Sequence, residues 1–187
     1  MNARADIVKT RRCERLSMLM RYKRWADALT FKTVLALPET EAFRERPTRW
    51  NNIVHTLNHV YVVDDIFKAH LEGRKHDYTH RNTDQTPAAA DLWTAVQRMD
   101  DWYVALADSL TERDLDEVVT FEFVGGGEGS MTKEDVLLHI VNHATYHRGL
   151  ISDMFYQIPV MPLTNDLTVF LRDHYGGAVA CEARSAA

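Results

Sequence analysis

Three histidines recur every fourth residue in the segment 137–156, and their spacing is the feature of this sequence best suited to chemistry. Residues four apart on an α-helix lie on nearly the same side, so His139, His143 and His147 would project together. His143 and His147 also fall on the apolar stripe of that helix, where leucine is expected, while His139 lies one step to the side. A buried polar group without a partner costs about 1–3 kcal/mol, so these two imidazoles need partners, and a metal ion would serve both. The stripe consists of Val136, Ile140, His143, His147, Leu150 and Met154.

A second histidine pair, His55 and His59, is also four residues apart and belongs to another predicted helix. This pair is the best source of a third ligand, although spacing alone does not choose between its two members. Imidazole is the commonest protein ligand for divalent transition metals. Three histidines from two helices would leave coordination positions open, as catalytic metal sites do.

The polar residues have several alternative interpretations. A single histidine on an apolar face is more often a core side chain bonded to a carbonyl or carboxylate, and this is the alternative to a metal site. A di-iron centre is disfavoured, because it needs repeated Glu-x-x-His pairs and the sequence has none. The glycine run 125–129 lacks the Lys-Ser/Thr ending of a phosphate loop. The remaining histidines are interpreted as solvated: His70, His76, His80 and His174.

Apolar residues with helical periodicity predict four long amphipathic helices. The first is expected over 12–37, before Pro38, and the second over 49–72, with Thr48 as its N-cap. The third is expected to start at Thr86-Pro87 and to run through Leu110. The fourth is expected to open on a capping box at 132–135 and to close at 158–159.

The intervening segments refine the predicted fold. Alternating β-branched residues over 118–123, followed by the glycine run, predict a short hairpin or extended loop before the last long helix. Residues 165–174 are expected to form a short fifth helix. The fold class predicted is therefore all-α, an antiparallel four-helix bundle whose second and fourth helices carry histidines on their inward faces.

Length and composition predict an ordinary globular protein. The chain has 187 residues, of which 45% are hydrophobic and 26% charged, so we expect one domain over 1–175 and a disordered tail over 176–187. The net charge of −5 disfavours nucleic acid as a partner. Cys13 and Cys181 form no disulfide framework, and no apolar run approaches the ~20 residues of a membrane span. We expect a cytoplasmic protein with no membrane partner.

Three segments carry a resemblance to a known family: residues 21–27 (RYKRWAD), residues 56–59 (TLNH) with Asp64, and residues 142–149 (NHATYHRG). Together they resemble the DinB/YfiT family of small four-helix bundle proteins, which are often dimeric. The resemblance implies one divalent metal ion, commonly zinc or nickel, held by three histidines. Residue by residue, these ligands fall on His59, His143 and His147. Leu150 departs from the family pattern, which usually has glutamine there, so a polar contact near the metal or substrate would be missing.

Relatives in this family include mycothiol-dependent maleylpyruvate isomerase and bacillithiol transferases. The resemblance therefore implies a homodimeric, metal-dependent transferase or isomerase that acts on a small molecule and uses a low-molecular-weight thiol. The metal would act as a Lewis acid or lower the pKa of a bound thiol or water. Three alternatives are a metal-dependent hydrolase, a non-catalytic metal-binding stress-response module, and a helical interaction protein with core histidines.

Overall fold

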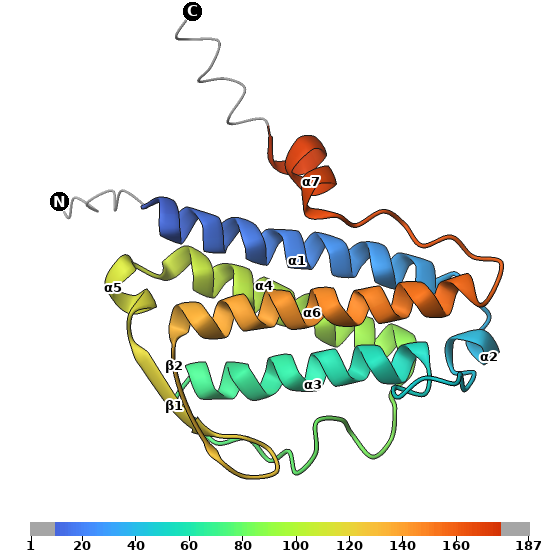
Figure 1. Ribbon diagram of the computed structural model, residues 1–187, viewed down its shortest axis with the longest axis horizontal. Coiled ribbons are helices and arrows are strands. Elements are labelled where there is room, and N and C mark those ends of the chain that lie inside the picture. The colour runs from blue at the N-terminus through green and yellow to red at the C-terminus, as the bar shows by residue number, and fades with distance from the viewer. Residues whose placement is uncertain (1–9, 177–187) are drawn as a thin grey trace, which may run out of the picture.

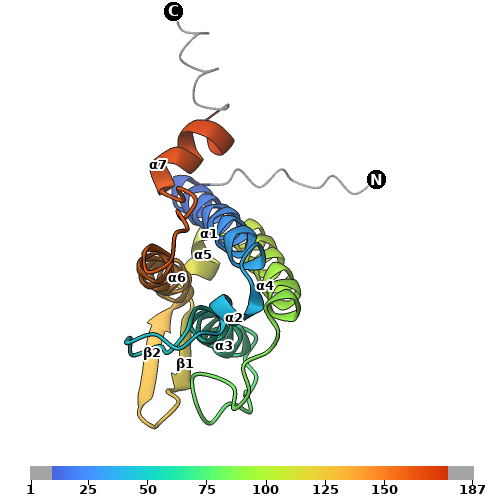
Figure 2. The ribbon, with the colours of Figure 1, turned by 90° about the vertical axis from the view of Figure 1, so that its right-hand side faces the viewer.

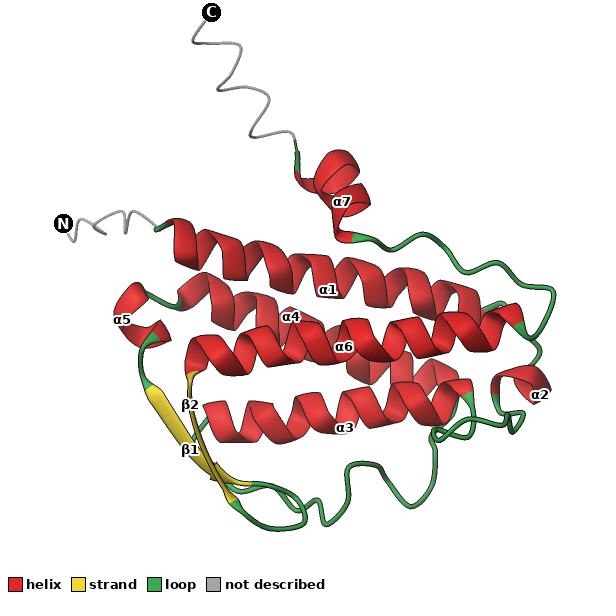
Figure 3. Cartoon of the chain, viewed as in Figure 1, coloured by secondary structure: helices red, strands yellow, loops and turns green. Residues whose placement is uncertain are grey.

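The computed structural model describes residues 10–176. This part of the chain is mostly helical with one small two-stranded sheet, which confirms the all-α expectation in its coarse form (Figures 1 and 3). Its four long helices run side by side in Figure 1. Helix α1 contacts α4 and α6, and α3 contacts the same two helices. The long helices are α1 (Arg11–Leu35), α3 (Ile53–Leu71), α4 (Ala89–Ser109) and α6 (Lys133–Tyr156).

Short elements connect the long helices. Strands β1 (Val118–Glu122) and β2 (Glu128–Thr132) pair antiparallel, from Val118 opposite Thr132 to Glu122 opposite Glu128. Figure 2 shows this hairpin projecting beside α3 and α6. Gly125, Gly126 and Gly127 form its turn with φ of 98° each, a conformation that favours glycine. The short helices are α2 (Glu39–Ala42), α5 (Glu112–Leu115) and α7 (Leu167–Phe170), the last continued by a π-helical turn, η1 (Leu171–Tyr175).

Local capping chemistry fixes where two of the long helices begin. The predicted capping box at the start of α6 is confirmed, because Thr132 and Asp135 each bond the other's backbone N–H. The predicted start of α3 is wrong. Asn52, not Thr48, caps this helix by accepting a hydrogen bond from the backbone N–H of His55 at 2.8 Å. Asn51 adopts a left-handed conformation (φ 63°) just before the cap, so residues 49–52 belong to a loop.

Other predicted boundaries shift by a few residues. Helix α1 ends at Leu35 rather than at residue 37, and α4 begins at Ala89, two residues after Pro87. The fifth helix is shorter than expected and ends in the π-helical turn. The predicted disorder of residues 177–187 lies outside the described residues. Within residues 10–176, no helix is both long enough and apolar enough to cross a membrane.

Two apolar clusters form the core, and buried polar residues lie between them. One cluster surrounds Met20, Tyr103 and Ile140, and the other surrounds Phe31 and Phe155. On each long helix, the buried polar side chains occur near the point where one cluster gives way to the other. These side chains are Lys23 and Asp27 on α1, Asn58, His59 and Asp64 on α3, Asp100 on α4, and His147 and Arg148 on α6.

Candidate metal centre

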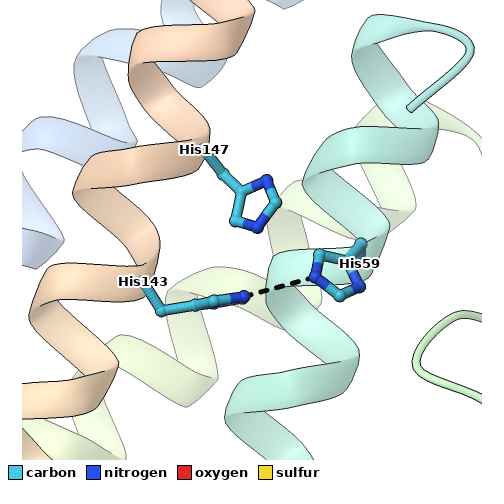
Figure 4. Close-up of side chains that lie close together, drawn as sticks. All are labelled: His59, His143 and His147. Carbon is cyan, nitrogen blue, oxygen red and sulfur yellow. Dashed lines mark hydrogen bonds between the residues drawn. The ribbon is translucent and has the colours of Figure 1, made fainter. Parts of the chain in front are cut away.

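Three histidines from two helices meet inside this polar layer (Figure 4). His59 on α3 faces His143 and His147 on α6, and one ring nitrogen of each lies within 4.8 Å of the other two. The Nε2 atoms of His59 and His143 are 3.2 Å apart. We call these three residues the histidine centre.

The histidine centre has the chemistry and approximate dimensions of a metal site. Two nitrogens bound tetrahedrally at about 2.0–2.1 Å from one ion lie roughly 3.3 Å apart, close to the His59–His143 separation. Ligands of one ion are at most about 4.2 Å apart, so the widest pair would need to close by roughly half an ångström. The Nδ1 atoms of His143 and His147 are buried and have no hydrogen-bond partner among residues 10–176. His143 faces His59 through Nε2, so an ion bound between them would leave the Nδ1 atom of His143 without a partner, and the observation that supports the site is the closeness of the three rings.

Burial keeps all three imidazoles in the neutral form that binds metals. His59 and His147 are 4% and 2% exposed, and His143 is half-buried. Burial, with the neighbouring histidines, lowers the pKa of His143 to about 2 and that of His147 to about 4. The pKa of His59 is lowered too, mainly by burial, although its contact with Arg81 acts in the opposite direction.

The loop after α3 orients His59. The Nδ1 atom of His59 lies 2.5 Å from the carbonyl oxygen of Arg81, and a carbonyl only accepts, so Nδ1 carries the proton. The lone pair of Nε2 then points toward His143, as in metal sites whose histidines donate their other N–H to the protein. Asn58 holds the same loop by donating hydrogen bonds to Asn82 and Thr83.

Two histidines that the sequence placed near the site take other partners. His55 contacts Thr86 Oγ1 at 3.1 Å through Nδ1 and Asn82 Nδ2 at 2.9 Å through Nε2, so it lies outside the histidine centre. His139 packs its ring 4.8 Å from Phe67 and 5.4 Å from His143. His59 therefore joins the pair on α6, and His139 lies to the side of the histidine centre.

Trp50 covers the histidine centre, which sequence reasoning missed. Its ring lies 4.2 Å from that of His59 and meets His147 edge-on at 4.8 Å. The prediction had placed Trp50 inside a helix, whereas the start of α3 at Ile53 leaves it in the loop. Asn52 was the available signal, since asparagine is a strong N-cap and apolar periodicity begins directly after it.

A second polar group, also missed, lies next to the histidine centre. The ammonium of Lys23 lies 2.9 Å from Asp27, 2.9 Å from Asp64 and 2.7 Å from Asp100, so it bridges three helices. Arg148, which directly follows His147, lies 3.0 Å from the other oxygen of Asp27. We call these five residues the ionic cluster.

Charge pairing and burial shift the pKa values of the aspartates in the ionic cluster in opposite directions. Burial raises the pKa of Asp64 to about 6 and that of Asp100 to about 7. Burial acts in the same direction on Asp27, but Lys23 and Arg148 together hold its pKa below the usual value. The cluster is thus a set of buried ion pairs in which two acids are poised to hold a proton.

The prediction that four outer histidines are solvated is wrong for two of them. His70 and His76 are half-buried, and the ring of His70 stacks on Phe121 at 4.5 Å. Burial lowers the pKa of His70 to about 4. His80 and His174 are exposed, as expected. Leu150 is only half-buried, because α6 turns Ile151 inward beside it.

Comparison with known proteins places this chain in a family. The model of the DinB family matches residues 8–175. Protein DinB of Bacillus subtilis (strain 168) is 25% identical over 162 residues, which cover 82% of this chain and 91% of that protein. The crystal structure of a DinB-like protein from Bacillus cereus ATCC 10987 has a TM-score of 0.54 at 19% identity, covering 77% of this chain and 91% of that one, and shows a likeness of fold. From the extent of the family match, this chain belongs to the DinB family.

Proposed function

We propose that this protein binds one divalent transition-metal ion, zinc or nickel, through His59, His143 and His147 and uses it in an enzyme reaction. The observation that carries the proposal is the meeting of three neutral imidazoles from two helices, two of them buried and one half-buried, with one ring nitrogen of each within 4.8 Å of the other two. Four helices that contact one another in a ring support an antiparallel bundle over a single domain, 1–175, as the frame of the site.

The residues of the site would divide the work between binding and shielding. The carbonyl of Arg81 fixes the tautomer of His59, so that its Nε2 is available as a ligand. Trp50 keeps water from the His59 and His147 rings on one side. The nearby ammonium of Lys23 adds to the lowering of the His143 pKa and so favours the unprotonated ligand.

A bound metal ion would supply a Lewis acid that lowers the pKa of a coordinated thiol or water. The thiol has no source at the site within the described chain. Cys13 is 2% exposed, is buried among apolar side chains of α1 and does not belong to the histidine centre. We therefore propose that a low-molecular-weight thiol comes from outside and that the reaction class is thiol transfer or thiol-assisted isomerisation.

The first test is metal content. Protein purified without a histidine tag should hold one metal ion per chain by plasma mass spectrometry. His59→Ala, His143→Ala and His147→Ala should each remove it, because two imidazoles alone bind much more weakly. His55→Ala and His139→Ala are the matched controls, and each should weaken binding by about 10–100-fold or less, as residues around the ligands do. Metal that persists in all three ligand variants would refute the site.

The second test is spectroscopic and addresses the thiol. Cobalt- or nickel-loaded protein should develop a sulfur-to-metal charge-transfer band when bacterial low-molecular-weight thiols are added. No such band at about millimolar thiol, with the metal still bound, would remove the thiol and favour hydrolysis or a non-catalytic metal-binding role.

A further inference from the structure

Two adjoining cavities lie between the C-terminal half of α3 and the β-hairpin, outside the histidine centre. Their volumes are about 550 Å³ and about 180 Å³. They share His70, Phe121, Phe123 and Val124 as lining residues, so they lie side by side, and we call the larger one the outer part and the smaller one the inner part of this space. None of the three centre histidines lines either part.

The inner part is mostly apolar, with His70 and Arg81 as its polar lining residues. Val63, Ile66 and Phe67 line it from α3, and Phe121 and Phe123 line it from the hairpin side. An apolar cavity of about 150 Å³ accepts benzene in another protein, so this volume fits a phenyl ring or a short aliphatic chain.

The outer part carries groups that suit an anion. Arg74, Lys75 and His76 line it, against a single acidic residue, Glu122. Arg74 already bonds Glu72 at 2.6 Å, which leaves Lys75 and His76 as the groups for a ligand. The Nδ1 atom of His76 is buried and lacks a hydrogen-bond partner within residues 10–176. Because that atom has almost no accessible surface, the ring would have to turn toward the cavity before a carboxylate oxygen could supply the partner.

The inner part reaches the surroundings of the histidine centre. Arg81 lines it, and the carbonyl of the same residue accepts the hydrogen bond from His59. Phe67 also lines it and packs on His139, whose ring is 5.4 Å from that of His143. Arg81 would thus separate a ligand in the inner part from His59, and Phe67 and His139 would separate it from His143.

We propose that this space binds a small organic acid with one aromatic or short aliphatic group. The carboxylate would accept hydrogen bonds from His76 and Lys75 at the outer end. The apolar group would lie between α3 and the hairpin and point toward the histidine centre. Because other side chains separate the space from the three histidines, the acid would be a ligand bound beside the metal site, and its binding does not require the proposed function.

The test is equilibrium binding to the full-length, metal-loaded protein by calorimetry, with phenylacetate as the probe and phenylacetamide as its neutral counterpart. Phenylacetate should bind saturably and about tenfold more tightly than the amide, the difference expected for a charge-assisted hydrogen bond. His76→Leu should abolish that preference and leave the amide unaffected. His80→Leu is the matched control, because His80 is exposed on the same loop and lines neither part of the cavity. It should bind both probes like the wild type.

Filling the inner part gives a second, independent variant. Val63→Phe should weaken both probes together, with folding checked by circular dichroism and thermal unfolding. The inference is overturned by absence of saturable binding up to about 10 mM, or by equal losses in His76→Leu and His80→Leu. Metal content measured on the same samples separates the two proposals. Bound metal without acid binding sinks this inference alone, and acid binding without metal sinks only the proposed function.

Discussion

The histidine centre and the ionic cluster are neighbours between the same helices, yet they solve the problem of burying polar groups in opposite ways. The ionic cluster pairs its charges internally, with Lys23 contacting three carboxylates and Arg148 contacting Asp27. The histidine centre keeps its groups neutral, and the Nδ1 atoms of His143 and His147 lack partners within the described chain.

This difference indicates a structural role for the ionic cluster and a ligand-binding role for the histidine centre. A set of buried charges that compensate one another holds helices in register and offers little to a ligand. In the histidine centre only His59 and His143 bond each other, and the buried lone pairs left over cost stability until something binds them. The pairing of Asp27 with both Lys23 and Arg148 links the two groups, since Arg148 directly follows His147 on α6.

Breaking the ionic cluster should have the largest effect on stability. Lys23→Met keeps most of the side-chain volume but removes the cation that compensates three buried carboxylates. We expect the free energy of unfolding to fall by about 3–5 kcal/mol, as for other broken buried ion pairs. Urea denaturation of metal-free protein measures it. Arg24→Met next to it removes an exposed pair with Asp101 and should cost less than about 1 kcal/mol. Equal losses in the two variants would mean that the ionic cluster is not structural.

Binding of a metal ion to the histidine centre should have the next largest effect on the free energy of unfolding. Free metal at about 100 times its dissociation constant should stabilise the wild type by roughly 2.7 kcal/mol, because only the folded chain brings the three ligands together. His147→Ala should show no such gain in the same thermal scans. At the same free metal concentration, His139→Ala should keep at least about 0.4 kcal/mol of the gain, the amount left by hundredfold weaker binding. Complete loss there would mean that the ligand set includes His139.

Acidification should change the contributions of the two groups to the free energy of unfolding in opposite directions. We expect these changes to be smaller than the effects of Lys23→Met and of metal binding. The pKa values of His143 and His147, about 2 and 4, lie below the ~6.5 of the unfolded chain. The unfolded state therefore binds more protons below about pH 6.5, and these histidines lower the free energy of unfolding as pH falls toward about 4. The pKa values of Asp64 and Asp100, about 6 and 7, lie above the ~3.9 of the unfolded chain. These two acids therefore raise the free energy of unfolding as pH falls from about 7 to 4.

Two variants separate these opposing contributions in metal-free protein. Asp100→Asn removes one acid, so its stability should fall more steeply on acidification than that of the wild type. His143→Asn removes one histidine, so its stability should fall less steeply. Urea denaturation in chelator across about pH 7 to 4.5 gives both curves. Parallel curves for all three proteins would show that neither group titrates as described.

The parts of this protein that the sequence predicted are those set by short-range geometry. The four-residue spacing of His143 and His147 places them on one face of any helix, and Thr132 and Asp135 cap α6 through bonds spanning three residues. The hairpin followed from alternating residues and a glycine turn.

Tertiary structure decided what depends on segments distant in the chain. His55 and His59 share a helix face, and the choice between them came from the loop after α3, where Asn82 and Thr86 engage one and Arg81 orients the other. Lys23 has one local partner, Asp27 on the same helix, but its burial depends on Asp64 and Asp100, which come from two other helices and compensate it only once those helices pack. Helical periodicity thus determined which side chains point inward. Whether an inward polar side chain becomes a ligand or part of an ion pair depended on which partners packing brings to it. The separation of two residues on different helices in the chain carries no information about their distance in space.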